Sequence, residues 1–550
     1  MPETVLYCSM FVVFCRVFQA VFNLAARLLP WRKAIPVEGA GCIEKVPGLL
    51  LKHKVAKPLL VTDGGLVRAG IAARLTDVLE GAKIPYAMFG EVEPNPSVNT
   101  VNAIQRLFFA ERCDGFIALG GGSPMDAAKA AAARVVRPEK NVNRLGGLLK
   151  VRRKLPTFIA IPTTAGTGSE TTIAALITDT KTRHKYAIMD LSLIPDYAVL
   201  DPELSTGLPA AITAATGMDA LTHAVEAYLC RTYNTGESIR FALEAVQTIF
   251  ANLEKVYADG SDVRARQAML GASYKAGFAF TRAGVGNVHA IAHTLGGLYD
   301  TPHGLANAVI LPAVLEDYGS KVHKKLARLA EVAGLVSGAG TKTRAEKARI
   351  FIDAIYAMNR RMGLPDGFDH IRSEDIPTMV KWAAKECNPL YPVPVIYNSE
   401  RFRRVIEGLR RMTYRIGNKC TGCTVCAKLC PVHAISGEKG MRHTVNRRRC
   451  VGCGVCGRTC PAGAVFDGGG NRCVQVKRPA WAKPVIDTKT CTACSICVAD
   501  CTPGALQISR PGFRGDINVH AELAKPEKCV GCGICKLHCP MGAVKMEAAG

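Results

Sequence analysis

The chain has 550 residues, 48% of them hydrophobic, and a formal net charge of +24, so it can build buried cores and is not a disordered protein. Of its 23 cysteines, 16 fall after Cys387 in four clusters of identical spacing. Cysteine concentrated in one segment excludes a disulfide scaffold. It favours metal or cluster ligands in a reducing compartment.

Residues 1–34 are predicted to form an N-terminal amphipathic helix that ends at Pro30. Glu3 stands where a secretory signal needs positive charge, and Arg16 near the middle disfavours a membrane span. We expect the helix to pack on its own protein or on a partner subunit; an interfacial membrane helix and a true span are the alternatives. The polar residues form one narrow stripe: Ser9, Arg16, Gln19, Asn23 and Arg27.

Residues 35–206 are predicted to form an α/β nucleotide-binding domain. Short apolar runs at 58–62, 116–119 and 157–161 alternate with helical stretches, a pattern typical of a parallel sheet. Each run ends at an acidic, glycine-rich or threonine-rich loop. Because ligands of open parallel sheets bind at the carboxyl ends of the strands, these loops are the first candidates for a binding site.

Two of these loops have the composition of a dinucleotide site. The glycines of residues 120–126 (GGGSPMD) would let the backbone approach a pyrophosphate at the start of a helix that Ser123 is predicted to cap. Alone, this loop is equally compatible with a simple capped turn, because it lacks the GxGxxG pattern. Residues 162–170 (PTTAGTGSE) add hydroxyl groups suited to phosphate and ribose oxygens. The predicted cofactor-binding residues of the two loops are Gly120, Gly121, Gly122, Ser123, Asp126, Thr163, Thr164, Thr167 and Ser169.

Residues 207–410 are predicted to form an all-helical domain that carries a metal site. Asp219 and His223 are four residues apart, hence on one helix face, and His289 and His293 repeat that spacing. His303 follows beyond a Gly- and Pro-containing turn. Carboxylate and imidazole ligands suit Fe²⁺ or Zn²⁺. Spacing alone does not decide between His289 and His293.

The C-terminal segment repeats C-x2-C-x2-C-x3-C twice in residues 411–466 and twice in residues 485–550. This spacing is typical of [4Fe–4S] ligation, whereas zinc ribbons would show isolated CxxC pairs. Proline follows the fourth cysteine in three motifs, and Thr502 replaces it in the third. The segment resembles a tandem of two bacterial-type ferredoxin modules.

That resemblance implies four [4Fe–4S] clusters, in which each fourth cysteine binds the neighbouring cluster. The implied sets are Cys420, Cys423, Cys426 with Cys460; Cys450, Cys453, Cys456 with Cys430; Cys491, Cys494, Cys497 with Cys539; and Cys529, Cys532, Cys535 with Cys501.

The cluster segment is strongly basic. From Arg411 onward there are 21 Lys or Arg and 8 Asp or Glu residues, a difference of +13. Four clusters with their thiolates would contribute about −8, which leaves roughly +5. We therefore expect no nucleic-acid binding and interpret this surface as suited to an acidic redox partner, with an ordinary solvated surface as the alternative.

Residues 39–412 resemble the iron-containing (group III) alcohol dehydrogenase family. The strings that carry the resemblance are VTD (61–63), GGGSPMDAAK (120–129), PTTAGTGSE (162–170), DPEL (201–204), GMDALTHAVEAY (217–228) and HAIAHTLGGLYDTPHGLANAVILP (289–312). The resemblance implies a dehydroquinate synthase-like architecture: an α/β dinucleotide-binding domain, then an all-helical metal-binding domain, with the site in the cleft.

The resemblance also implies residue roles. The metal ligands would be Asp219, His223, His289 and His303, and His293 would either support the ligands from behind or contact the substrate, where it could relay a proton. Asp63 would face the adenosine ribose and favour NAD over NADP. Lys185 would lie near the nicotinamide ribose, and Phe280 would line the substrate pocket.

We thus expect a metal-dependent oxidoreductase that transfers hydride between a small primary alcohol, or its aldehyde, and NAD(H). Hydride carries two electrons, a cubane accepts one, and no flavin fingerprint is evident. The clusters would therefore exchange electrons with a flavoprotein or a soluble redox carrier. The alternatives are a structural or redox-sensing cluster module, or a scaffold with a dead dehydrogenase site, which the complete ligand set argues against. We expect a cytoplasmic homodimer in a reducing or anaerobic environment, without membrane association.

Overall fold

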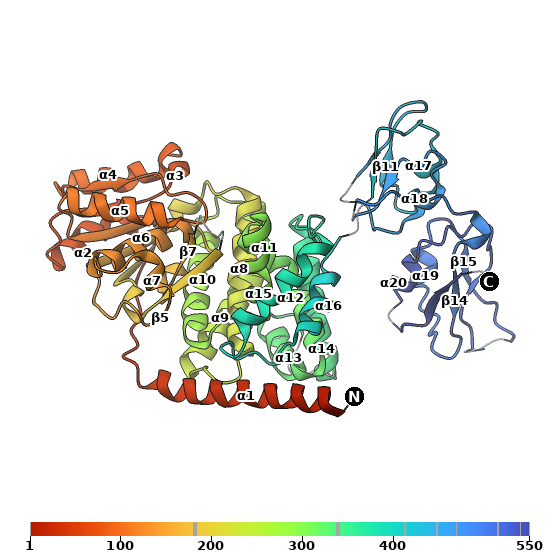
Figure 1. Cartoon of the computed structure of the whole chain (residues 1–550), viewed down its shortest axis with the longest axis horizontal. Helices are drawn as coiled ribbons and strands as arrows, with labels where there is room; N and C mark the ends of the chain where they lie inside the picture. The colour runs from red at the N-terminus through yellow and green to blue at the C-terminus, as the bar shows by residue number, and fades with distance from the viewer. Residues whose placement is uncertain are drawn as a thin grey trace. The chain divides into compact units, whose positions relative to one another are not determined.

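The computed structural model describes residues 2–179, 184–336, 341–411, 414–446, 449–468, 470–513, 516, 518–539 and 541–548; the side chains of residues 2–9, 184 and 185 lie outside this description. The chain divides into two compact units (Figure 1). The larger unit comprises Met1–Asp366 and Asp375–Leu409, and the smaller unit comprises Gly367–Glu374 and Arg410–Gly550. The finer division into five domains stays a prediction.

A six-stranded parallel sheet forms the centre of the α/β domain. Its strand order is β1-β9-β6-β4-β2-β3, and every neighbouring pair is parallel. The predicted runs at 58–62, 116–119 and 157–161 are β2, β4 and β6, which are adjacent, so the loops after them meet at one edge of the sheet. The strand bounds are β1 Ile35–Glu38, β2 Pro58–Val61, β3 Ala87–Phe89, β4 Gly115–Gly120, β6 Thr157–Pro162 and β9 Tyr197–Leu200.

Helices and a second sheet complete this domain. The helices are α2 Val46–Lys52, α3 Gly64–Arg68, α4 Ile71–Gly81, α5 Val98–Ala110, α6 Gly122–Val136 and α7 Val142–Leu145, with the 3-10 helices η1 Cys42–Lys45, η2 Ser169–Thr171, η3 Leu191–Leu193 and η4 Pro202–Ser205. The second sheet has the order β5-β8-β7, formed by β5 Gly147–Leu148, β7 Ala174–Asp179 and β8 His184–Met189.

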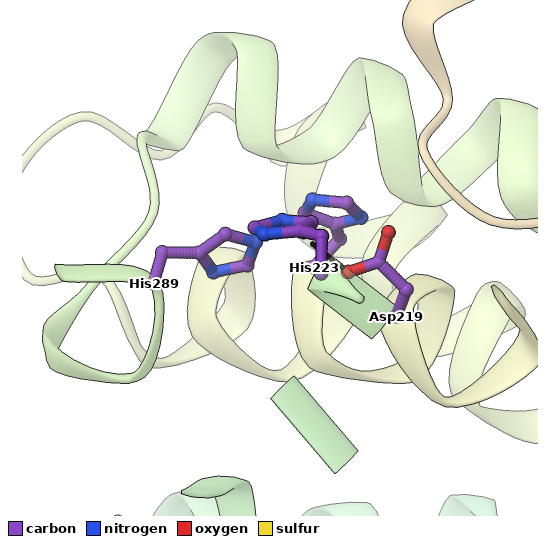
Figure 2. Close-up of side chains that lie close together, drawn as sticks. Asp219, His223 and His289 are labelled. Atoms are coloured by element: carbon purple, nitrogen blue, oxygen red, sulfur yellow. Dashed lines mark ion pairs between the residues drawn. The ribbon is translucent and has the colours of Figure 1, made fainter. Parts of the chain in front are cut away.

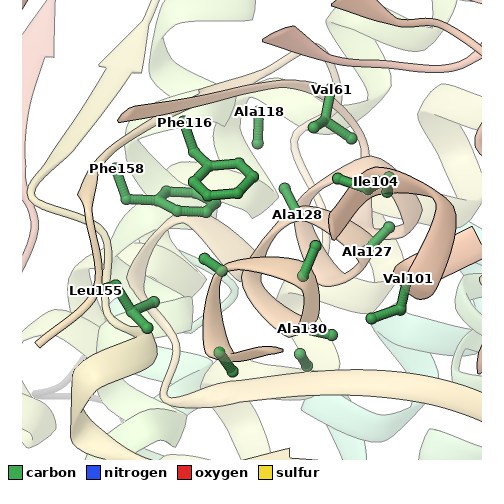
Figure 3. Close-up of a cluster of buried hydrophobic side chains, with 14 of the residues drawn as sticks. Val61, Val101, Ile104, Phe116, Ala118, Ala127, Ala128, Ala130, Leu155 and Phe158 are labelled. Carbon is green, nitrogen blue, oxygen red and sulfur yellow. The ribbon is translucent and has the colours of Figure 1, made fainter. Parts of the chain in front are cut away.

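Helix α6 packs closely on the central sheet because its buried face consists of small side chains. Figure 3 shows Ala127, Ala128 and Ala130 of α6 beside Phe116 of β4 and Phe158 of β6. The close fit holds the N-terminus of α6, with its unpaired backbone N–H groups, at the carboxyl edge of the sheet.

The prediction that Ser123 caps α6 is wrong, because the helix begins at Gly122 with Gly121 as its N-cap. The chain turns immediately after β4 at Gly120, whose φ is +149° and where a Cβ would lie 2.7 Å from Cγ of Pro124. A side chain at position 120 would clash with Pro124, so the chain could not turn into the helix at this residue.

From Ala210 to Leu409 the described residues form helices and connecting loops, as predicted. The helices are α8 Ala210–Leu229, α9 Gly236–Ala258, α10 Val263–Ala283, α11 Asn287–Tyr299, α12 His303–Tyr318, α13 His323–Val332, α14 Arg344–Arg361, α15 Ile376–Cys387 and α16 Ser399–Gly408, with the 3-10 turn η5 Gly319–Lys321; the boundary between the two units falls within the 3-10 turn η6 Ser373–Asp375.

The N-terminal helix α1, Pro2–Arg27, belongs to the larger unit and is drawn in red in Figure 1. It buries Cys15 and Gln19 completely, whereas Phe14, Val21 and Leu24 are exposed. Its segment Met10–Arg27 is long and apolar enough to cross a membrane by length and composition. The expectation that the protein does not associate with a membrane stays a prediction.

The smaller unit contains two modules of the same construction. In the first, β10 Arg415–Ile416 pairs with β13 Val465–Phe466, and β11 Ile435–Ser436 pairs with β12 Thr444–Val445. In the second, β14 Lys483–Ile486 pairs with β17 Val544–Glu547, and β15 Leu506–Ile508 pairs with β16 Ala521–Leu523. The short helices are α17 Val425–Leu429, α18 Val455–Thr459, α19 Ile496–Ala499, α20 Ile534–Leu537 and η7 Arg478–Ala480. Outer strands thus join the two ends of each module.

A small core links the two modules. It consists of Val455, Trp481 and Val530, and Cys453 of the first module and Cys532 of the second pack against it. A guanidinium Nη2 of Arg458 donates to both the Cys453 carbonyl (3.2 Å) and the Gly531 carbonyl (3.0 Å). The second and fourth cysteine motifs therefore meet at this junction.

Candidate metal and nicotinamide site

Four side chains from three helices of the helical domain converge on one point. Asp219 and His223 come from α8, His289 from α11 and His303 from the first position of α12, and one ligand atom of each lies within 4.8 Å of the others. Figure 2 shows Asp219, His223 and His289 gathered there. The structure thus brings together the four residues that the sequence predicted as ligands.

Two neighbouring side chains orient these groups. Nδ1 of His289 lies 2.6 Å from Oε2 of Glu226, which leaves Nε2 directed at the cluster. Backbone N–H groups of Gly286 and Val288 also donate to Glu226, so this buried carboxylate is fixed. Nδ2 of Asn307 lies 2.6 Å from Oδ1 of Asp219 and 3.1 Å from Nε2 of both His289 and His303.

The Asn307 contacts test whether a cation fits. The side-chain amide N–H₂ group of Asn307 contacts one carboxylate oxygen and two imidazole nitrogens. These three acceptors therefore already converge on one positively polarised group, as they would on a cation. Burial lowers the pKa of His223 and of His289 to about 4 in each case, which keeps both imidazoles neutral at pH 7. Neutral imidazoles and a carboxylate are a suitable ligand set for Fe²⁺ or Zn²⁺.

His293 lies beside this cluster but has a different partner. Its Nδ1 lies 2.6 Å from Oε1 of Glu386, and its ring stacks on His303 with the centroids 5.2 Å apart. The hydroxyl of Tyr391 donates to the same Glu386 oxygen at 2.8 Å. The structure therefore separates His293 from His289, which the spacing alone could not do. Sequence analysis did not identify Glu226, Asn307 or Glu386.

The two predicted nucleotide loops pack directly on each other. A Cβ on Gly122 would lie 2.9 Å from Cγ2 of Thr167, and one on Gly168, whose φ is +60°, would lie 2.5 Å from the Gly277 Cα. The Ser169 hydroxyl donates to Asp126 at 2.8 Å. Glycine is thus required where the loops meet each other and the helical domain.

Buried Lys129 of α6 holds the second loop in place, a role that sequence analysis missed. Its ammonium group donates to the Thr172 hydroxyl at 2.9 Å and carbonyl at 3.0 Å, and also reaches Ser169 and Ala174. Burial lowers the pKa of Lys129 to about 8 and raises that of the neighbouring Glu170 to about 7. These groups act within the scaffold of the loop.

One cavity of about 760 Å³ connects the nucleotide loops to the metal cluster. Gly122, Ser123 and Thr167 line it from the α/β domain, and His293 and Phe280 line it from the helical domain, together with the four clustered residues. Phe280 stacks on the His223 ring, with centroids 4.2 Å apart. The predicted pocket residue and the predicted cofactor loops therefore share one space.

Two further predicted cofactor residues lie at the two sheets of the α/β domain, one at each. Asp63 follows β2 and caps α3, with Oδ1 accepting from the backbone N–H groups of Gly65 (2.8 Å) and Leu66 (3.0 Å). Lys185 is part of β8, but its side chain lies outside the described residues. The cofactor roles of both residues stay predictions.

The cluster cysteines of the smaller unit are arranged in crossed sets. Burial raises the pKa of Cys426 to about 11, and the neighbouring thiols that add to this are those of Cys420, Cys423 and Cys460. Burial also raises the pKa of Cys497, whose neighbouring thiols are Cys491, Cys494 and Cys539. Cys453 has Cys430 and Cys450 as neighbours, and Cys532 has Cys529 and Cys501.

Each fourth cysteine accepts a hydrogen bond from a backbone N–H four residues later. The four donors and acceptors are Ala434 to Cys430 (3.2 Å), Ala464 to Cys460 (3.3 Å), Ala505 to Cys501 (3.2 Å) and Ala543 to Cys539 (3.3 Å). The distance at Cys501 matches the others, so Thr502 does not disturb the geometry where proline is expected. The prediction on Pro540 falls outside the described residues.

A parallel α/β domain that meets a helical domain at an Asp–His cluster defines a metal-dependent dehydrogenase of the nicotinamide class. The chain belongs to the iron-containing alcohol dehydrogenase family: residues 36–202 match the family model for iron-containing alcohol dehydrogenase, and residues 213–403 match that for the C-terminal part. Residues 419–464 and 490–544 each match a 4Fe-4S dicluster domain. The chain is therefore an oxidoreductase of a family that binds NAD and iron, with two modules that imply four [4Fe–4S] clusters. This confirms the predicted family, fold and cofactors.

The relatives are dehydrogenases and reductases. The chain is 40% identical over 337 residues to the 1,3-propanediol dehydrogenase of Klebsiella pneumoniae, covering 60% of this chain and 86% of that protein. It is 37% identical over 353 residues to the NAD-dependent methanol dehydrogenase of Bacillus methanolicus, covering 64% and 91%. Among solved structures, 1,3-propanediol oxidoreductase is 35% identical with a TM-score of 0.66, covering 70% of this chain and all of that one. The Oenococcus oeni alcohol dehydrogenase is 30% identical with the same TM-score, covering 69% and 100%.

The cofactor preference can be tested at Asp63 without removing the helix cap. We expect Asp63→Ser to keep the cap of α3, because serine also accepts from the N2 and N3 backbone groups. Loss of the carboxylate should remove repulsion of a 2′-phosphate and lower the preference for NAD over NADP by about tenfold to a hundredfold. Steady-state kcat/KM with both cofactors measures this ratio. A wild type that already prefers NADP would contradict the role of Asp63.

Proposed function

We propose that this protein oxidises small primary alcohols, or reduces their aldehydes, by hydride transfer with NAD(H) at the Asp219, His223, His289 and His303 cluster. The observation that carries the proposal is the single cavity that contains both this cluster and the two nucleotide loops. Names among the relatives, including 1,3-propanediol dehydrogenase, methanol dehydrogenase and lactaldehyde reductase, support short alcohols or aldehydes as the substrate class.

The reaction converts one alcohol and NAD⁺ into one aldehyde, NADH and one proton. A divalent metal held by the four residues would supply Lewis acidity that polarises the substrate oxygen. Glu226 fixes the His289 ring so that its Nε2 faces the site. The hydrogen bond of Nδ1 to Glu386 leaves Nε2 of His293 to accept the proton from the alcohol.

We further propose that the crossed cysteine sets each hold one [4Fe–4S] cluster that exchanges electrons with a redox partner. Each cubane accepts one electron, whereas NADH donates a hydride, so a flavin must take the pair and release it singly. The partner is therefore a flavoprotein, or a soluble carrier served by one, and the basic charge of residues 411–550 favours an acidic docking surface. A structural or redox-sensing role is the second candidate, favoured by the thiols that make up much of each module core.

One further feature supports a homodimer, and another supports a location in the cytoplasm. Strand β1 lies at an edge of the central sheet, and an edge strand can pair with a second copy, which supports a homodimer. Confinement of the cluster cysteines to one segment supports a reducing, cytoplasmic environment.

One anaerobic experiment tests both parts of this proposal. A panel of primary alcohols and NAD is added to the iron-loaded, flavin-free protein while NADH and cluster absorbance are recorded together. We expect NADH to form while the clusters stay oxidised, and the clusters to bleach only after a flavoprotein is added. Salt should slow that bleaching, because docking between exposed charges is screened.

The two possible failures are separate in this experiment. Absence of NADH formation across the panel, with the metal site filled, would refute the alcohol dehydrogenase activity. Rapid bleaching without any flavin would refute the requirement for a flavoprotein. Clusters that never bleach with any flavoprotein would favour the structural or sensing role.

A further inference from the structure

We propose that helix α1 forms one wall of the substrate end of the active-site cavity and selects primary alcohols with an apolar tail of several carbons. This inference rests on the proposed function, because it assigns a role to the cavity that contains the metal cluster. The match to the family model begins at residue 36, so α1 precedes the part of the chain that matches that model. Side chains of α1 and of the segment after it nevertheless line the cavity: Phe22, Asn23, Ala25, Ala26, Arg27, Leu29 and Trp31.

The polar stripe fixes α1 to the catalytic domain. Nε2 of fully buried Gln19 donates to the carbonyl groups of Pro389 (2.9 Å) and Tyr391 (2.8 Å). Arg16 donates through Nη1 to the Gln19 amide oxygen (2.9 Å) and through Nη2 to the Pro394 carbonyl (3.1 Å). Every polar atom of the Gln19 side chain is thus used, so α1 has a defined rotation and position on this surface.

The segment that Arg16 and Gln19 of α1 contact also lines the active-site cavity. Leu390, Tyr391 and Pro392 line the same cavity, and the Tyr391 hydroxyl donates to Glu386, the partner of His293. Helix α1 therefore lies next to the side of the cavity where the proton is transferred. This places its cavity-facing residues near the substrate rather than near the adenosine end of the cofactor.

Phe22 connects this wall to the helical domain. Its ring lies 5.4 Å from the ring of Tyr233, which also lines the cavity and whose hydroxyl donates to the Leu390 carbonyl. The wall is continued by Trp31, whose indole N–H donates to the Ala26 carbonyl (2.7 Å) and whose ring lies under the guanidinium of Arg282.

The apolar side chains of this wall indicate the kind of substrate tail that it would bind. Phe22, Ala25, Ala26 and Leu29 present hydrocarbon to the cavity, and Phe280 and Leu390 face them from the catalytic domain. Asn23 and Arg27 are the polar cavity residues of α1, and Arg27 is exposed to solvent. An alkyl chain gains affinity from such a wall for each buried methylene group, whereas a polyol would lose hydrogen bonds with water.

The test compares two adjacent positions of α1 in the full-length, cluster-loaded protein. Phe22→Ala removes the ring from the cavity, and Val21→Ala removes a similar apolar side chain from the same helix at a position that is 64% exposed and does not line the cavity. The measured quantity is kcat/KM for the series of unbranched primary alcohols from ethanol to hexanol, with NAD at saturation. Thermal unfolding of each variant reports whether α1 and its domain remain folded.

We expect the wild type to favour the longer alcohols. In Phe22→Ala, kcat/KM for hexanol should fall about tenfold or more while that for ethanol changes less than about threefold, because a lost hydrophobic contact affects only a tail that reaches it. The conservative variant Phe22→Leu should show a smaller fall in the same direction, and Val21→Ala should keep the wild-type profile.

An unchanged chain-length profile in Phe22→Ala, with a wild type that oxidises alcohols, would overturn this inference and leave the proposed function intact. A wild type that oxidises no primary alcohol with its metal site filled would instead refute the proposed function. An equal fall for ethanol and hexanol in Phe22→Ala would also overturn the inference, because it would indicate general damage to the site rather than loss of a tail contact.

Discussion

Replacement of His303 by alanine is expected to abolish alcohol-dependent NADH formation. His303 is the proposed ligand from α12, and its Nε2 lies 3.7 Å from Oδ1 of Asp219. Without it three ligands remain, so the metal should be lost or bound too weakly to polarise the substrate. Because a Lewis-acid metal contributes several kcal/mol of transition-state stabilisation, kcat/KM should fall at least about a thousandfold. Metal analysis and NADH formation are measured on the same preparation.

His323 provides a matched control. Like His303, it is the first residue of a helix and is partly exposed, but it does not line the cavity. His323→Ala should keep both metal and activity. The circular dichroism of His303→Ala should match that of the wild type, because the His303 side chain is 32% exposed and lies outside the core. A His303→Ala protein that retains full metal and full activity would refute its role as a ligand.

The second large effect concerns the smaller unit, which should depend on its clusters for folding. Its paired strands are two to four residues long, and cysteines make up half of the buried core of the first module, beside a few apolar residues such as Ile435 and Val465. Four thiolate-bound cubanes and one mononuclear iron predict roughly 17 iron atoms and about 16 acid-labile sulfides per chain. Removal of the clusters should unfold this unit, while the larger unit keeps its structure.

Iron and sulfide assays on anaerobically purified protein measure the cluster content. Limited proteolysis of the cluster-free form then measures whether the smaller unit is still folded. Proteolysis should cut residues 414–548 and spare the larger unit. Replacement of Cys473, which belongs to none of the crossed sets, by serine should leave the iron content unchanged. About half the predicted iron would mean that one module holds no clusters, and a protease-resistant cluster-free unit would contradict the dependence of folding on the metal.

The sequence predicted the parts of the fold that follow from local pattern. The apolar runs at β2, β4 and β6 are bounded by glycine and threonine loops, so their identity as buried strands could be read directly. Asp219 and His223 could be paired from spacing because they share one helix face, whereas the choice of His289 over His293 came from the family resemblance. The start of α6 was misplaced because Gly120 permits a turn that residues with a side chain would not.

The missed residues share a physical reason. Glu386 lies 93 residues from His293 in the chain, so no spacing connects them before the helices pack. Asn307 and Glu226 could have been found from spacing. Asn307 lies one helical turn after the predicted ligand His303, and Glu226 lies one turn after His223. The rotation of α1 could not be predicted, because pattern arguments bury the apolar face, and this helix instead supplies polar donors to the carbonyl groups of Pro389, Tyr391 and Pro394.

The junction around Trp481 would decide whether the two modules share their electrons. Cys453 and Cys532 belong to different modules and pack on the same small core, so clusters held by the second and fourth cysteine motifs would be neighbours, and the four would form one series instead of two separate pairs. With one electron per cubane, four clusters would have a capacity of four electrons, which equals the yield of two alcohol oxidations. Under the proposed exchange with a flavoprotein, a chain filled in this way would hold reducing equivalents until a carrier docks, so that their supply and demand need not coincide in time.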